Sequence, residues 1–148
     1  MEIGKARVLQ EGSDVTVVAL GNMVNVARDA IADAKISADL VDLATLVPWD
    51  RETVLKSVKK TGRLIVVEES PWSGGWGSEI ISTVTTEAFS ALKCAPFRIT
   101  APDVPVPYNG TLEARYIPSA VHVSAALKAA VESNQVLKPW WITEGVSK

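Results

Sequence analysis

The chain has 148 residues, of which 47% are hydrophobic, enough for one compact domain with a sizeable core but too few for two ordinary domains. Its 15 basic and 17 acidic residues give a net charge of -2, which argues against nucleic acid or an anionic membrane as a partner. The single cysteine, Cys94, excludes an internal disulfide and a cysteine-based metal cluster, and is expected to be a small buried apolar residue.

The N-terminus shows no secretory signal pattern, and no apolar run approaches the roughly 18 residues that a membrane span needs. A single cysteine also suits a reducing compartment. The sequence therefore predicts a soluble, cytoplasmic protein.

The first elements alternate between apolar runs and amphipathic segments. Arg7–Gln10 lies too close to the next strand for a crossover helix, which predicts an antiparallel edge strand. Val15–Leu20 is a continuous apolar run, typical of a strand covered on both faces. From Asn22 onward, apolar residues recur at helical spacing, with charged residues on the opposite side, which predicts an amphipathic helix.

The alternation then repeats. A strand over Ala38–Leu43 is followed by Asp50, whose carboxylate can cap a helix over Arg51–Lys60. Gly62 is expected to end that helix. The remaining predicted elements are a strand over Arg63–Glu68, a helix over Ser78–Leu92 and a short strand over Phe97–Thr100. This order predicts a three-layer α/β/α fold around a mostly parallel, five-stranded mixed sheet with one antiparallel edge strand.

The last third of the chain is expected to be less regular. Four prolines and a glycine in Ala101–Ser119 predict a long surface loop without regular structure. Ser119 then caps a helix over Ala120–Ser133. We therefore expect a domain over residues 1–133 and a C-terminal tail over 134–148, whose Trp140 and Trp141 must dock on the domain or bind a partner.

The glycine turn within Ser70–Ile80 is the most distinctive segment. Gly74, Gly75 and Gly77 let the main chain pass where side chains would clash. Free N–H groups before a helix could cradle a phosphate. However, the Walker lysine is absent and Glu79 would repel an anion, so tight packing against a neighbour is the favoured interpretation.

Four ionisable residues are candidate functional groups. Glu68 and Glu69 follow a strand at the sheet edge where ligands usually bind, but adjacent strand residues point to opposite faces, which favours capping or interface hydrogen bonds over acid-base chemistry. His122 has no second histidine or cysteine nearby and is expected to be a surface or interface residue. Asp103 is expected to accept main-chain N–H groups and fix a turn.

Several segments together resemble one known module. They are Gly4–Val8, Glu11–Thr16, Val41–Leu43, Pro48–Asp50, Lys59–Leu64, Gly74–Glu79, Thr100–Tyr108, Leu112–Glu113 and Tyr116–Ser119. This pattern is similar to the C-terminal domain of the beta subunit of thiamine-diphosphate-dependent 2-oxo acid dehydrogenases of the pyruvate, branched-chain and acetoin type, itself a transketolase C-terminal domain. The resemblance runs from Gly4 to about Val131, and the proline loop favours this family over deoxyxylulose-phosphate synthase.

The resemblance implies that this chain is not itself catalytic. In the family, thiamine diphosphate and magnesium lie between a pyrimidine domain and a diphosphate domain, neither of which this sequence contains. No catalytic, cofactor-binding or metal-binding residue is therefore carried over, and the isolated chain is expected to be inactive. Two features depart from the family: many members have His-Glu before the proline of the glycine turn where this chain has Glu68–Ser70, and the tail from Asn134 extends past the usual end.

The implied function is an assembly and partner-docking domain of an oxidoreductase that oxidatively decarboxylates a 2-oxo acid and acylates lipoyl groups. The implied partners are the alpha subunit, the rest of the beta subunit, the dihydrolipoyl acyltransferase core and a second copy in a homodimer. The predicted interface residues are Trp72, Gly74, Gly75, Trp76, Gly77, Trp140 and Trp141, although the tryptophans could instead complete the core.

The alternative hypothesis is a stand-alone α/β domain that binds a small molecule or a phosphate at the glycine turn. A start at Met1, so close to the beginning of the domain, indicates either an excised domain or a gene fragment.

Overall fold

A computed structural model describes residues 2–146; Met1 and residues 147–148, the end of the predicted tail, lie outside the described residues. Five strands form one sheet in the order β1-β3-β2-β4-β5. They are β1 (Arg7–Gln10), β2 (Val15–Ala19), β3 (Ala38–Asp42), β4 (Leu64–Pro71) and β5 (Phe97–Ala101). β1 pairs antiparallel with β3 and the other pairs are parallel, which confirms the predicted mixed sheet with its antiparallel edge strand.

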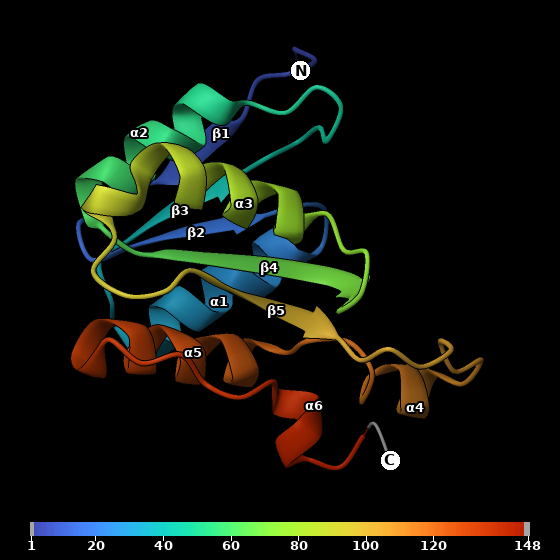
Figure 1. Ribbon diagram of the computed structural model, residues 1–148. Coiled ribbons are helices and arrows are strands. Elements are labelled where there is room, and N and C mark those ends of the chain that lie inside the picture. Colours follow the sequence, from blue (N-terminus) through green and yellow to red (C-terminus); the bar gives the residue numbers. More distant parts are fainter. Residues whose placement is uncertain (1, 147–148) are drawn as a thin grey trace.

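Helices cover both faces of this sheet. They are α1 (Met23–Ala34), α2 (Arg51–Thr61), α3 (Gly77–Ala88), α4 (Gly110–Glu113), α5 (Ala120–Ser133) and α6 (Trp140–Thr143). α2 and α3 lie on one face, and α1 and α5 lie on the other, so the predicted three-layer architecture is confirmed (Figure 1). Within residues 2–146, no helix has the length and apolar character needed to cross a membrane.

The side chains of the strands contribute to two hydrophobic cores, one on each face of the sheet. Val15, Val17 and Ala19 of β2 pack with α1 and α5, whereas Val18 packs with α2 and α3. Successive side chains of a strand point to opposite faces, so a strand covered on both sides has apolar residues on both. The polar exception in β2, Thr16, is buried, and its hydroxyl is hydrogen-bonded to hydroxyl groups of α2. The coverage on both faces explains why the largely apolar run of β2 could be identified in the sequence.

The predicted ends of α2 are confirmed. The side chain of Asp50 accepts the N–H of Thr53 at 3.0 Å and the N–H of Ala6 at 3.1 Å. Burial alone would raise the pKa of Asp50, but the hydrogen bonds from Thr53 and Ala6 outweigh it and hold the pKa below its ordinary value. At the other end, Gly62 adopts a left-handed conformation with φ of 77°.

Two predicted boundaries and one predicted irregular loop were wrong. β4 does not end at Glu68 but continues to Pro71, which pairs with β5. The helix predicted to reach Leu92 ends at Ala88 and is followed by a short 3-10 helix, Phe89–Ala91. The proline-rich loop contains one helical turn, α4, because the side chain of Asn109 accepts the N–H groups at its start and the prolines lie outside it.

Arg63 holds the end of α5 and the beginning of the tail against the sheet. Its guanidinium donates to the carbonyl oxygens of Ala130 and Asp14 at 2.9 Å and 3.0 Å, and to the side-chain oxygen of Asn134 at 2.8 Å. Asn134 adopts the left-handed conformation, with φ of 52°, that ends α5. The tail therefore leaves the domain from a fixed point.

Candidate functional site

Glu68 is the central residue at the carboxyl end of the sheet. It lies on β4 with no exposed side-chain surface. Its Oε2 accepts the N–H of Gly77, the first residue of α3, at 3.1 Å, and its Oε1 accepts a hydrogen bond from the guanidinium of Arg98 at 3.1 Å. A carboxylate is favoured at a helix N-terminus by the free N–H groups and by the helix dipole. Glu68 therefore caps α3 from the neighbouring strand, in agreement with the capping role predicted for it.

The glycine turn is packed directly against this carboxylate. A Cβ atom on Gly75 would lie 2.8 Å from Oε2 of Glu68, and one on Gly77 would lie 2.7 Å from Oε1 and 2.9 Å from a methyl group of Val66. Gly74 has φ of 75°, a conformation that favours glycine. The predicted close approach is confirmed, and the neighbour against which the turn packs is part of the same chain.

The Glu68 carboxyl is poorly suited to reacting with a substrate. Burial raises its pKa above the ordinary value, while the hydrogen bonds from Gly77 and Arg98 partly oppose this rise. Both of its oxygens are already bonded. A phosphate at this turn would have to displace the protein's own carboxylate from the Gly77 N–H, which weakens the phosphate-binding alternative.

Arg98 links this cluster to the surface. It donates a second hydrogen bond to the carbonyl oxygen of Trp72 at 2.8 Å, and its guanidinium carbon lies 4.7 Å from the centre of the Trp72 ring. The Trp72 ring in turn contacts Trp141 edge-on, with ring centres 6.2 Å apart. The glycine turn and the C-terminal tail therefore share one surface.

Asp103 joins the proline-rich loop to the same turn. Its carboxylate accepts the N–H of Ser73 at 2.8 Å and the hydroxyl of Ser73 at 2.7 Å. These hydrogen bonds hold the pKa of Asp103 below its ordinary value. The predicted role of Asp103 in fixing a turn is confirmed.

The tail docks on β5 and α5 through Trp140, which is only 9% exposed. Its indole N–H donates to the carbonyl oxygen of Thr100 at 2.9 Å, and its ring stacks on His122 with ring centres 4.1 Å apart. The other predicted tryptophans are less buried: Trp72 is 39% exposed, and Trp76 and Trp141 are half-buried. Trp140 therefore completes the core of its own chain, while Trp72 presents the largest aromatic surface of the four.

His122, expected to be a surface or interface residue, is half-buried at the start of α5, with its side chain 15% exposed. Its Nδ1 accepts the N–H of Ser119 at 3.0 Å, within the capping arrangement of α5. A nitrogen that accepts carries no proton, so Nε2 bears the proton and donates to Glu144 at 3.0 Å. His122 thus fastens the tail to the start of α5.

Sequence reasoning missed Arg98 and misjudged Cys94. Arg98 interrupts the apolar residues of β5, and a charged residue inside a short strand of a buried sheet is a signal that a partner is needed. Cys94 is half-buried rather than fully buried, and burial raises the pKa of its thiol. Within residues 2–146, no group of three or more histidine, cysteine, aspartate or glutamate residues could hold a metal ion.

A pocket of about 430 Å³ lies beside this cluster, between β5, α5 and the tail. Its lining includes Phe97 and Ile99 from β5, Val121 and Ala125 from α5, and Leu137 from the tail. The lining is mainly apolar, so the pocket could hold an apolar group, and it offers no reactive constellation.

Comparisons with known proteins match residues 4–123 to the family described as Transketolase, C-terminal domain. The chain is 40% identical over 135 residues to the acetoin:2,6-dichlorophenolindophenol oxidoreductase subunit beta of Cupriavidus necator, covering 89% of this chain and 40% of that protein. It is 41% identical over 128 residues to the pyruvate dehydrogenase E1 component subunit beta of Rickettsia conorii, covering 84% of this chain and 39% of that protein.

Among solved structures, the chain resembles a split-gene transketolase, an inactive beta4 tetramer, with a TM-score of 0.74 and 33% identity over 91% of this chain and 44% of that one. The chain thus spans about two fifths of the length of the curated relatives that it matches.

Proposed function

The chain belongs to the transketolase C-terminal domain family, and we propose that it is the non-catalytic assembly and partner-docking domain of a thiamine-diphosphate-dependent 2-oxo acid dehydrogenase beta subunit. The observation that carries this proposal is its identity of about 40% with such beta subunits, over most of this chain but only 39–40% of theirs. The parent enzyme would be a cytoplasmic oxidoreductase that decarboxylates a 2-oxo acid and acylates a lipoyl group. Thiamine diphosphate and magnesium would be held by other parts of that enzyme.

The carboxyl end of the sheet supports a structural role for this domain. Glu68 and Arg98 bond to each other and to the main chain, and Asp103 bonds to Ser73. Groups that are already bonded in this way are poor acids, bases or nucleophiles, because a substrate would have to break the existing bonds. What the region does offer is a rigid surface of well-defined shape.

The partners that we propose are the alpha subunit, the rest of the beta subunit, the dihydrolipoyl acyltransferase core and a second copy of this domain. The relatives are named as beta subunits, which supports an alpha-type partner. The split-gene transketolase that this chain resembles is a beta4 tetramer, which supports association between copies.

The self-association surface that we propose includes the glycine turn. Trp72 is 39% exposed and is held in place by Arg98 on one side and Trp141 on the other. Aromatic side chains held in one conformation lose little entropy on binding and are enriched at the centres of interfaces. Trp72 is therefore the residue whose loss is expected to weaken association most.

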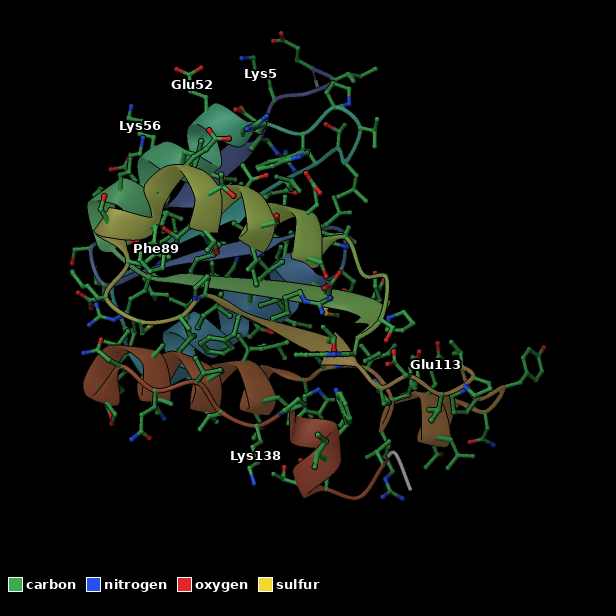
Figure 2. The ribbon with its side chains drawn as sticks, viewed as in Figure 1. Lys5, Glu52, Lys56, Phe89, Glu113 and Lys138 are labelled. Carbon is green, nitrogen blue, oxygen red and sulfur yellow. The ribbon has the colours of Figure 1, made fainter. Side chains whose placement is uncertain are left out.

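Equilibrium sedimentation of the wild type and of Trp72→Ala tests this proposal. We expect the wild type to associate, and the dissociation constant to rise at least about tenfold in the variant, as for an interface hot spot. Phe89→Ala is the matched control: this aromatic residue is 69% exposed but lies at the opposite end of α3 from the glycine turn (Figure 2). A wild type that stays monomeric, or a Phe89→Ala effect as large as that of Trp72→Ala, would contradict the proposed surface.

A further inference from the structure

The outer edge of β5 is not paired with another strand within the described residues, because β5 ends the sheet. The hydrogen bonds between β2, β4 and β5 determine which peptide groups of β5 point toward β4 and which point away from the sheet. The N–H of Thr16 in β2 donates to the carbonyl oxygen of Arg63, so the peptide groups of the alternate β4 residues 64, 66 and 68 face β5. The β4–β5 register then turns Phe97 and Ile99 toward β4. The intervening residues of β5 must therefore present their peptide groups to the open edge.

Those intervening residues are Arg98 and Thr100. The Thr100 carbonyl oxygen accepts the indole N–H of Trp140, which lies beyond the sheet, in agreement with this assignment. The other three groups, the N–H and C=O of Arg98 and the N–H of Thr100, form no hydrogen bond with any part of the chain that the structure describes. Unbonded main-chain groups in a largely buried strand are costly and are the usual template for an added strand.

The apolar pocket of about 430 Å³ runs beside these three groups. Val121 and Ala125 of α5 line one side, and Leu137 and Trp140 of the tail line the other. Val121 is 75% exposed and Leu137 is 43% exposed, so apolar surface continues outside the pocket. An edge strand beside a helix with an apolar groove between them is the arrangement in which proteins bind extended peptides.

We propose that the groove between β5 and α5 binds an extended peptide segment of another protein, which adds to the sheet as a sixth strand. The peptide main chain would bond to the N–H and C=O of Arg98 and to the N–H of Thr100. One apolar side chain would enter the pocket, since side chains alternate along a strand.

The charges at the groove favour a peptide with an acidic residue. Lys138 lines the pocket and forms no ion pair with any of residues 2–146 (Figure 2 shows it beside α6). Glu144 also lines the pocket, but its carboxylate is bonded to His122. Because His122 is neutral, Glu144 keeps its negative charge, but its carboxylate already accepts a hydrogen bond, whereas Lys138 has no such partner among residues 2–146. Lys138 is therefore the group at the groove that can pair with a carboxylate of the peptide.

A second copy of the chain is a poorer occupant. If the β5 edge of a second copy entered the groove, the α5 and tail of that copy would come with it. The groove is already bounded by α5 and the tail of the first copy, so these elements would collide. A narrow single strand fits between these walls more readily than the edge of a whole domain.

The test uses a phage-displayed library of random linear nine-residue peptides, selected on the full chain, followed by synthesis of the most enriched peptide. We expect the enriched sequences to share an apolar residue near an acidic one. We also expect the synthetic peptide to slow amide hydrogen exchange at Arg98 and Thr100 while leaving Phe97 and Ile99 unchanged, because the latter amides already bond to β4. This alternating pattern is specific to strand addition.

A pair of matched variants locates the binding site. Ala125→Arg places a long side chain in the groove from the exposed surface of α5, and should weaken peptide binding at least about tenfold, or by about 1.4 kcal/mol. Ala32→Arg makes the same change at an exposed position of α1 that does not line the pocket, and should leave binding unchanged.

Three outcomes would overturn the proposal. The first is a library that yields no sequence enriched over a selection without protein. The second is a peptide whose binding does not slow exchange at Arg98 and Thr100, or that binds Ala125→Arg as well as the wild type. The third is slower exchange of these two amides with rising protein concentration and no peptide, which would identify a second copy as the occupant.

Discussion

At the glycine turn, the main-chain N–H that begins α3 donates to a carboxylate of the protein itself, whereas along the outer edge of β5 three main-chain groups have no hydrogen-bond partner in the described part of the chain. The two regions are joined by Arg98, whose side chain serves the turn and whose peptide group faces the edge. The buried ion pair of Glu68 and Arg98 thus lies where the main-chain N–H already has a hydrogen-bond partner. The main-chain groups without a partner among residues 2–146 lie instead beside the apolar side chains of the groove.

The largest effect is expected from a substitution that disrupts the close packing of the glycine turn. Gly77→Val places a branched side chain where even a Cβ atom would lie 2.7 Å from Glu68 and 2.9 Å from Val66. We expect the domain to unfold or to lose about 4 kcal/mol or more of its free energy of unfolding, measured by urea denaturation. Gly110→Val is the control, because nothing lies within 4 Å of the added Cβ, and it should cost less than about 1 kcal/mol. Equal urea midpoints for the two variants would show that the turn is not closely packed.

A smaller effect is expected when the turn keeps its shape but loses its cation. Arg98→Met leaves the buried Glu68 carboxylate without an ion-pair partner and should lower the free energy of unfolding by about 3 kcal/mol at pH 7. The double variant Arg98→Met, Glu68→Gln should lose less than the sum of the single losses, because no unpaired charge remains. Additive losses would mean that the pair does not act as a unit.

The pH dependence of Arg98→Met gives a second readout of the same pair. The pKa of Glu68 is already raised by burial, and removing Arg98 should raise it further. A raised pKa in the folded state favours folding at low pH and loses that contribution as pH rises through the folded value. The variant should therefore regain part of its lost stability between pH 7 and pH 5, and a loss that is constant over this range would contradict the assignment.

The smallest effect is expected on the side of the edge. Trp140→Phe keeps a ring that can stack on His122 but removes the N–H that donates to the Thr100 carbonyl oxygen. Loss of one neutral hydrogen bond should cost about 1 kcal/mol in urea denaturation. A loss of unfolding free energy as large as that of Arg98→Met would show that the contacts at the edge contribute as much to stability as those at the turn.

Most of the fold could be predicted because its signals are local. The apolar run of β2, the cap at Asp50 and the end of α2 at Gly62 each follow from neighbouring residues. α4 was missed because prolines dominate its loop, while its cause is the side chain of Asn109, which bonds the next N–H groups. A count of helix-breaking residues does not detect a single capping residue between them.

The candidate site was less predictable because its partners are distant in sequence. Arg98 meets Glu68 across 30 residues, and Trp140 meets Thr100 across 40. The sequence also did not distinguish Trp140 from Trp141, since two adjacent tryptophans in a tail carry no periodicity. Only the docking of the tail shows that Trp140 lies inward and that its neighbour contacts Trp72. The open edge of β5 could not be read from residue types because it consists of main-chain groups.

Arg63 holds Asn134 in place, and this anchor affects how easily another molecule could displace the tail from the surface on which it docks. Only residues 135–139 separate Asn134 from Trp140, so the indole is tethered close to its position beside Thr100. Such a short connection gives an effective concentration on the order of millimolar. A soluble molecule that displaces Trp140 must overcome this intramolecular competitor, whereas a molecule that enters the groove beside it displaces no part of the chain.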